Sequence, residues 1–231
     1  MDADEPPGQA AEAARYAVLR RIGPALRHDL IVNLQAVGMM TDVVAARIDR
    51  GLPPLAELQQ HLARIQRGTR EAIANSLRVA TWLVPPEDDS ISLRDGVLEC
   101  LALVRSGLEF RGYAVRAELE ETDFQVSSAS LRPLVLAALL HLADHERAPG
   151  ELAVSARLDP GHATLTLART QTGPGAVREA ADTEAPYRRM QTQDVLALAR
   201  GAHADLRLED PCIFIRLQRL VPTSPLQIAP V

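Results

Sequence analysis

The chain has 231 residues, of which 47% are hydrophobic and only 3% aromatic, and its formal net charge is −5. This length allows one large domain or two small ones, and an apolar set dominated by Ala and Leu favours packed helices over a β-sandwich. The acidic balance argues against a nucleic-acid-binding protein, which normally carries a basic surface.

The sequence contains no signal for export and no evident membrane span. Its first residues, Met1-Asp2-Ala3-Asp4-Glu5, are acidic where a signal peptide is basic, and the strongly apolar stretch at 134–143 is too short to cross a bilayer. We therefore expect a cytoplasmic protein without a membrane part. Cys100 and Cys212 fit no metal-binding spacing, so we expect two buried apolar thiols and no disulfide.

Two long amphipathic helices are predicted before residue 85. Gly51 and Pro53-Pro54 separate them by a connection so short that the helices must be antiparallel neighbours. Such a hairpin leaves one side uncovered, which predicts a homodimer with a four-helix bundle over residues 10–84. The apolar or small residues recur at alternating steps of three and four: Leu30, Leu34, Val37, Thr41, Val44 and Ile48, then Leu55, Leu58, Leu62, Ile65, Thr69, Ala72, Ser76, Ala80 and Leu83.

Beyond the break at 85–90 the pattern becomes mixed α/β. Together with the hairpin it predicts the α+β class, a helical hairpin followed by a two-layer α/β sandwich over residues 90–220. The expected elements are a helix at 91–110, a strand at 113–120, a short strand ending at Val126, a helix at 131–146, a hairpin of strands at 152–158 and 163–168, a helix at 192–202, and strands at 205–208 and 212–217.

His28 lies in Leu26-Arg27-His28-Asp29-Leu30-Ile31, one position beside the apolar seam of the first helix. A side chain there is partly exposed but rigidly held. A neutral imidazole nitrogen can attack a phosphoryl group and pass it on. The alternative for a single helical histidine is a solvated or core-satisfied ring.

The segment Arg27-His28-Asp29-Leu30-Ile31 resembles the H-box of histidine kinases, and most closely that of the ChpT-like and sporulation-type histidine phosphotransferases. The order of the later elements is similar to the ATP-binding domain of the kinases, so the resemblance covers about residues 15–220. It implies that His28 accepts the phosphoryl group and that Asp29 orients the imidazole or raises its basicity. Arg27 would steady phosphoryl oxygens, although a solvated helix charge explains it equally well. The implied partners are receiver domains of response regulators, which bring their own phospho-aspartate and magnesium.

Three departures from the kinase pattern indicate that the nucleotide chemistry is lost. Leu142 stands where the kinases have a magnesium-binding Asn, and Gln171 replaces the adenine-reading Asp ahead of Gly173 and Gly175. The glycine-rich lid is absent from residues 187–193. We therefore expect a degenerate domain with neither cofactor nor metal on this chain. His141 and His145 have zinc-ligand spacing, but without a third ligand an ordinary helix surface is the favoured interpretation.

Two classes of function follow. The first is a phosphotransferase relaying through His28, with Val32, Gln35 and Met39 as the accessible surface for receivers. Because Val32 occupies the i+4 position, where phosphatase-active kinases have Thr or Asn, we expect little hydrolysis; Asn33 is the neighbouring alternative. The second class is a catalytically silent pseudokinase scaffold that binds or sequesters a signalling partner. An active kinase with unusual nucleotide contacts is a third possibility, and His61 is the next candidate acceptor after His28.

Overall fold

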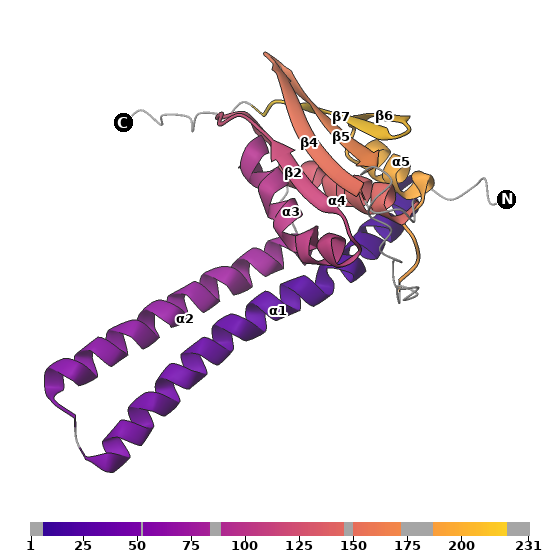
Figure 1. Ribbon diagram of the computed structural model, residues 1–231. Coiled ribbons are helices and arrows are strands. Elements are labelled where there is room, and N and C mark those ends of the chain that lie inside the picture. The colour runs from indigo at the N-terminus through magenta and orange to yellow at the C-terminus, as the bar shows by residue number, and fades with distance from the viewer. Residues whose placement is uncertain (1–6, 52, 84–88, 146–149, 172–186, 221–231) are drawn as a thin grey trace, which may run out of the picture. The chain divides into compact units, whose positions relative to one another are not determined.

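The computed structural model describes residues 7–51, 53–83, 89–145, 150–171 and 187–220 (Figure 1). Its contacts divide the chain into two compact units. One is a helical unit, Leu19–Pro86, and the other is an α/β unit that combines Met1–Val18 with Glu87–Val231. The predicted α+β class, a helical hairpin followed by an α/β layer, is confirmed.

The helical unit is an antiparallel hairpin of α1 (Pro7–Arg50) and α2 (Leu55–Leu83), as predicted. Arg47 near the end of α1 forms an ion pair with Glu57 in the first turn of α2. Further along, Gly68 lets the helices approach closely, because a Cβ at this position would lie 2.9 Å from Met40 Cε and 3.3 Å from Val37 Cγ2. Glycine at residue 68 therefore fixes the packing of α2 against the middle of α1.

The first turns of α1 belong to the α/β unit. Ala11, Ala14 and Val18 recur at steps of three and four and are buried. Gly201, the last residue of α5 (Thr192–Gly201), lies so close to Ala11 that an added Cβ would be 3.0 Å from the alanine methyl group. Small residues on both helices permit this contact.

The α/β unit is built on a five-stranded sheet with the strand order β2-β4-β5-β7-β6. Its strands are β2 (Ala114–Glu118), β4 (Gly150–Asp159), β5 (His162–Gln171), β6 (Asp205–Glu209) and β7 (Cys212–Gln218). Only β2 and β4 are parallel. Alternate residues are buried on one face, which α3 (Leu93–Phe110), α4 (Ser128–Asp144) and α5 cover (Figure 1): Leu152, Val154, Ala163, Leu165, Leu167, Ile213, Ile215 and Leu217.

The prediction of a helix from residue 91 was wrong at its start. Residues 90–92 form strand β1 (Ser90–Ser92), which pairs antiparallel with β3 (Gln125–Ser127). The helix begins only at Leu93, because the Ser92 side chain accepts the Asp95 N–H at 3.5 Å and caps the first turn. The helix predicted at 131–146 begins three residues earlier, at Ser128, and Glu146 lies outside the described residues.

Among the described helices, α1 alone is long and apolar enough to cross a membrane by length and composition, with a mean hydropathy of 1.3 over its most apolar window. The apolar stretch at 134–143 instead lies in α4. Helix α1 also contains Asp29, Asn33 and Asp42.

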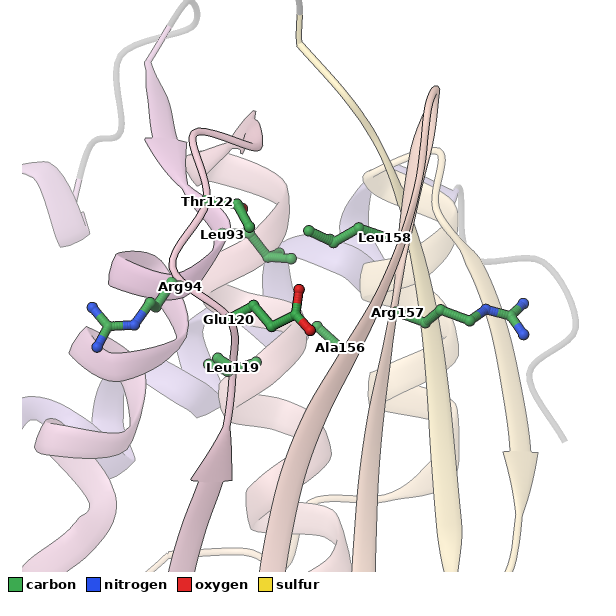
Figure 2. A pocket seen from close by; sticks show the side chains of 8 residues that line it. All are labelled: Leu93, Arg94, Leu119, Glu120, Thr122, Ala156, Arg157 and Leu158. Atoms are coloured by element: carbon green, nitrogen blue, oxygen red, sulfur yellow. The ribbon is translucent and has the colours of Figure 1, made fainter.

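A cavity of about 240 Å³ lies between the start of α3 and strand β4 (Figure 2). Glu120 points into its centre, whereas the guanidinium groups of Arg94 and Arg157 extend away from it on opposite sides. The cavity therefore lacks the inward cations that a phosphate-binding pocket needs.

Candidate functional site

His28 is exposed in the middle of α1, as are its neighbours Arg27 and Asp29. Its place on the helix follows from the positions that face α2, namely the half-buried Leu30 and Val37 and the buried Val44. At 3.6 residues per turn, a residue two positions before Leu30 points largely away from α2. The imidazole is therefore open to a docking protein, while its backbone is fixed in the long helix.

Asn33 lies on a different side of α1 from His28. Its side-chain amide donates a hydrogen bond to the main-chain carbonyl of Asp29 at 2.6 Å, one turn back. The residue is half-buried. With its NH₂ group held by the helix itself, Asn33 is poorly placed to position a water next to His28.

A strip of exposed apolar side chains runs along α1 beside His28. Three residues each come directly before a residue that faces α2, so they lie on one flank of α1. We name these residues the docking strip: Val32, Met39 and Val43. Met39 is 69% exposed and Val32 46% exposed. Gln35 is also exposed, two turns after His28 and on its side of the helix. Val32, Gln35 and Met39 are the residues predicted to contact receivers, and Val43 is a further exposed residue along α1.

The opposite flank of the hairpin carries a second apolar stripe. Six residues on this flank each come directly after a residue that faces the other helix. We name them the outward stripe: Leu34, Thr41 and Ile48 of α1, and Leu62, Thr69 and Ile73 of α2. Leu34 is 59% exposed and Ile73 is 56% exposed. The two threonine hydroxyls donate to main-chain carbonyls one turn back, Thr41 to Val37 and Thr69 to Ile65, each at 2.9 Å. Both hydroxyls therefore remain satisfied if another surface covers the stripe.

Few hydrophobic side chains are buried in this hairpin. Beyond Leu26, the buried hydrophobic residues among those described in the helical unit are Val44 and Ala72. An amphipathic helix gains most of its stability by packing its apolar face. Several large apolar side chains of the outward stripe are instead exposed, among them Leu34, Ile48, Leu62 and Ile73.

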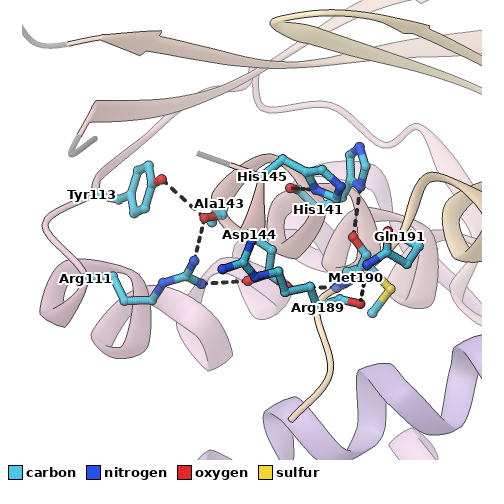
Figure 3. Close-up of polar contacts among 9 residues, drawn as sticks. All are labelled: Arg111, Tyr113, His141, Ala143, Asp144, His145, Arg189, Met190 and Gln191. Atoms are coloured by element: carbon cyan, nitrogen blue, oxygen red, sulfur yellow. Dashed lines mark hydrogen bonds and ion pairs between the residues drawn. The ribbon is translucent and has the colours of Figure 1, made fainter. Parts of the chain in front are cut away.

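In the α/β unit, charged and polar contacts gather at the C-terminal end of α4 (Figure 3). The buried Asp144 carboxylate accepts Arg111 Nη1 at 2.9 Å and the main-chain N–H of Met190 at 2.8 Å. The main-chain carbonyl of Ala143 accepts a hydrogen bond from Arg111 and another from the Tyr113 hydroxyl, the latter at 3.2 Å. These contacts fix the segment before α5 against α4.

His141 also contributes to this attachment. Its Nδ1 lies 3.0 Å from the Met190 carbonyl oxygen, so it donates this hydrogen bond, and its ring centroid is 4.1 Å from that of His145. Burial lowers the pKa of His141, with a smaller lowering from His145, and the hydrogen bond to Met190 opposes the shift. Within the described part of the chain no group of three or more metal-ligating side chains occurs.

The start of α5 is fixed by a second carboxylate. Asp194 accepts two hydrogen bonds from Arg188, at 2.6 and 2.8 Å, and one from the Gln191 N–H at 2.8 Å. Burial alone would raise the pKa of Asp194, but the hydrogen bonds from Arg188 and Gln191 outweigh it and the pKa is lowered. Residues 188–191 are therefore held from both sides, by Asp144 and by Asp194.

The positions that departed from the kinase pattern are placed as follows. The Leu142 side chain is buried in α4. The main chain of Gln171 ends β5, and residues 173–175 lie outside the described residues.

His61 is half-buried and lies 3.7 Å from the Glu57 carboxylate, one turn back on α2. Cys100 is buried and Cys212 is half-buried, and both are free thiols.

The role of Asp144 was not predicted from the sequence. A signal for Asp144 was present, since an acidic residue inside an otherwise apolar helix must find a partner.

No protein-family model matches the chain, and no curated protein matches it. Among solved structures, it is similar in fold to the histidine kinase AdeS of Acinetobacter baumannii, with a TM-score of 0.44 and 11% identity over 85% of this chain and 98% of that one. A bacterial phosphotransferase gives a TM-score of 0.36 with 17% identity, over 87% of this chain and 95% of that one. The histidine kinase ThkA in complex with the response regulator TrrA gives 0.41 with 12% identity, over 95% of this chain and 67% of that one.

Proposed function

We propose that this protein is a histidine phosphotransferase that relays a phosphoryl group between response-regulator receiver domains through His28, without using ATP. The observation that carries the proposal is the His28-Asp29 pair of the H-box-like segment, exposed on a rigid helix beside the docking strip. A scaffold has no need for this pair. The chain is then a dimeric cytoplasmic protein with a transfer hairpin over residues 10–84 and a degenerate ATP-binding domain over 90–220.

In the transfer, the lone pair of a His28 ring nitrogen attacks the phosphorus of a receiver phospho-aspartate. A P–N bond forms as the bond between phosphorus and the aspartate oxygen breaks, and the electron pair of that bond returns to the carboxylate. The proton on the other ring nitrogen is released to water, which reaches the exposed ring. Attack of a second receiver's carboxylate on phospho-His28 reverses these steps.

The chain's own contribution to catalysis is positioning. The long helix holds His28 in a fixed orientation, and Asp29 stabilises the positive charge that develops on the imidazole. Arg27, exposed next to His28, is placed to steady phosphoryl oxygens. The receiver supplies magnesium, so this chain requires no cofactor.

Dimerisation through the outward stripe completes the hairpin. The residues of the outward stripe on α1 and on α2 lie on the same flank of the hairpin. Each follows a residue that faces the other helix. Because α2 runs antiparallel to α1, the residue that follows an inward-facing position lies on the same flank in both helices. A second copy that presents the same stripe buries both surfaces in a four-helix bundle. The docking strip lies on the other flank, so the dimer leaves it accessible.

The buried Leu142 supports the absence of nucleotide chemistry. An apolar side chain inside the core cannot bind magnesium, which requires oxygen ligands. The α/β unit then serves as a structural or partner-binding domain.

The competing function is a silent pseudokinase scaffold, which the exposed apolar side chains of the hairpin favour. Two incubations separate the candidates. The protein is mixed with [γ-³²P]ATP and magnesium, and separately with receiver domains labelled by [³²P]acetyl phosphate. A phosphotransferase takes label only from receivers, an active kinase takes it from ATP, and a scaffold takes it from neither.

A further inference from the structure

We infer that Arg67 and Arg78 on α2 form the basic half of the receiver-docking surface and select partners whose facing surface is acidic. The inference rests on the proposed function, because it concerns the same transfer at His28. It adds partner selection by charge, and it assigns that selection to α2 rather than to the helix that carries the histidine.

The register of the hairpin places the two arginines. Two contacts between the helices set the register: Arg47 with Glu57, and Val37 with Gly68. Between these two contacts, the residue number falls by ten along α1 and rises by eleven along α2. A further nine residues along each helix lead from Val37 to His28 and from Gly68 to Leu77. By this count Arg78 is level with Arg27, next to His28, and Arg67 is level with Gly38, next to Met39.

Both arginines also lie on the correct flank. Arg67 and Arg78 precede Gly68 and Val79, which are half-buried against α1, just as Val32 and Met39 precede Asn33 and Met40. In an antiparallel pair, these preceding positions lie on one flank of the hairpin. His28 and Met39 are eleven residues apart, as are Arg67 and Arg78, which corresponds to about 16 Å along a helix. The two arginines thus lie on the same flank as the docking strip, and His28 lies beyond the strip, on the side of α1 that points away from α2.

The charge of this surface differs from that of the whole protein. Between Leu19 and Pro86 the sequence has nine arginines and five acidic residues, a net charge of +4, whereas the whole chain has −5. In the described part of the chain, neither Arg67 nor Arg78 forms an ion pair with a carboxylate, unlike Arg47. Arg78 is instead held by a hydrogen bond from its guanidinium to Asn75 Oδ1.

These features specify the occupant. An apolar strip with a basic border fits a protein surface that has an apolar centre and carboxylates on one side. The two arginines supply half of the net charge of +4 of the helical unit. Two exposed cations about 16 Å apart accelerate encounter with such a partner and disfavour basic ones.

The test compares charge reversals at equivalent exposure. Arg67→Glu and Arg78→Glu are measured against Arg70→Glu, which makes the same charge change two positions before Ala72, on the side of α2 that points away from α1. The probe is an isolated receiver domain with an acidic surface, labelled by [³²P]acetyl phosphate. The second-order rate of label transfer to His28 is measured at about 0.01 M and about 0.15 M salt, where the Debye length is about 30 Å and about 8 Å.

We expect Arg67→Glu and Arg78→Glu each to slow transfer by about five- to tenfold at low salt and by less at the higher salt, and Arg70→Glu by less than about twofold. Equal effects of all three variants, or a change in the oligomeric state of Arg78→Glu by light scattering, would overturn the inference and leave the proposed function intact. If the unaltered protein takes no label from any receiver, the proposed function itself is overturned.

Discussion

Asp144 and Met190 are joined by a hydrogen bond of 2.8 Å from the Met190 N–H to the carboxylate, although 46 residues separate them in the sequence. The same carboxylate pairs with Arg111 at 2.9 Å, and its side chain is only 4% exposed. Asp144 therefore connects the end of α3, the end of α4 and the segment before α5. Neutralising this buried carboxylate is costly, because Arg111 then loses the counter-charge that Asp144 provides.

Asp144→Asn should lower the free energy of unfolding by about 2–4 kcal/mol, as expected for breaking a buried ion pair and weakening a hydrogen bond to the main chain. Urea unfolding monitored by circular dichroism measures the change. Glu118→Gln is the control, because Glu118 pairs with Arg116 at the surface and contributes about 1 kcal/mol or less. Equal losses in the two variants would contradict the role assigned to Asp144.

His141 should make stability depend on pH. Burial lowers its pKa in the folded state below the ordinary value near 6.5, so the unfolded chain binds the proton more readily. The contribution of His141 is fully present above about pH 6.5 and declines as the pH falls through that value. We expect the thermal midpoint to fall between about pH 7.5 and pH 5.5, and to fall less in His141→Gln. His203→Gln, at an exposed turn, should keep the slope of the unaltered protein.

Leu34→Glu and Ile73→Glu should convert the dimer into monomers, because each places a charge in the outward stripe where a second copy packs. Light scattering at micromolar concentration gives the mass. Val32→Asp, on the other flank, should remain dimeric. A well-folded monomeric parent protein would contradict the four-helix bundle. A parent protein that sediments with membranes would instead place the apolar face of α1 in lipid.

Val32→Asp and Met39→Asp should slow transfer from a labelled receiver by about tenfold without changing the mass of the dimer. A carboxylate in the docking strip costs apolar contact and repels an acidic partner. Gln59→Asp adds the same charge at an exposed position near the start of α2 and should have little effect. Unchanged transfer in both docking-strip variants would show that receivers approach His28 from another side.

The sequence predicted the order and nature of most elements, because their apolar periodicities are strong. It failed at residues 90–92, where the local pattern suited a helix but pairing with Gln125–Ser127 produces a strand. The exposure of His28 followed from its place beside the seam. The contact of Asp144 with Met190 could not be predicted, because it depends on how a segment 46 residues away returns to α4. Likewise, Arg67 and Arg78 become recognisable only when the register of the hairpin is known.

The central claim is that His28 itself carries the phosphoryl group. The most direct test is the transfer of label from a ³²P-labelled receiver to the unaltered protein and to His28→Ala, with the attachment site located by mass spectrometry under alkaline conditions that preserve phosphohistidine. His28 is exposed, so the variant should keep the fold and the dimer while losing all acid-labile label. Retained label in His28→Ala, at His61 or elsewhere, would contradict the account.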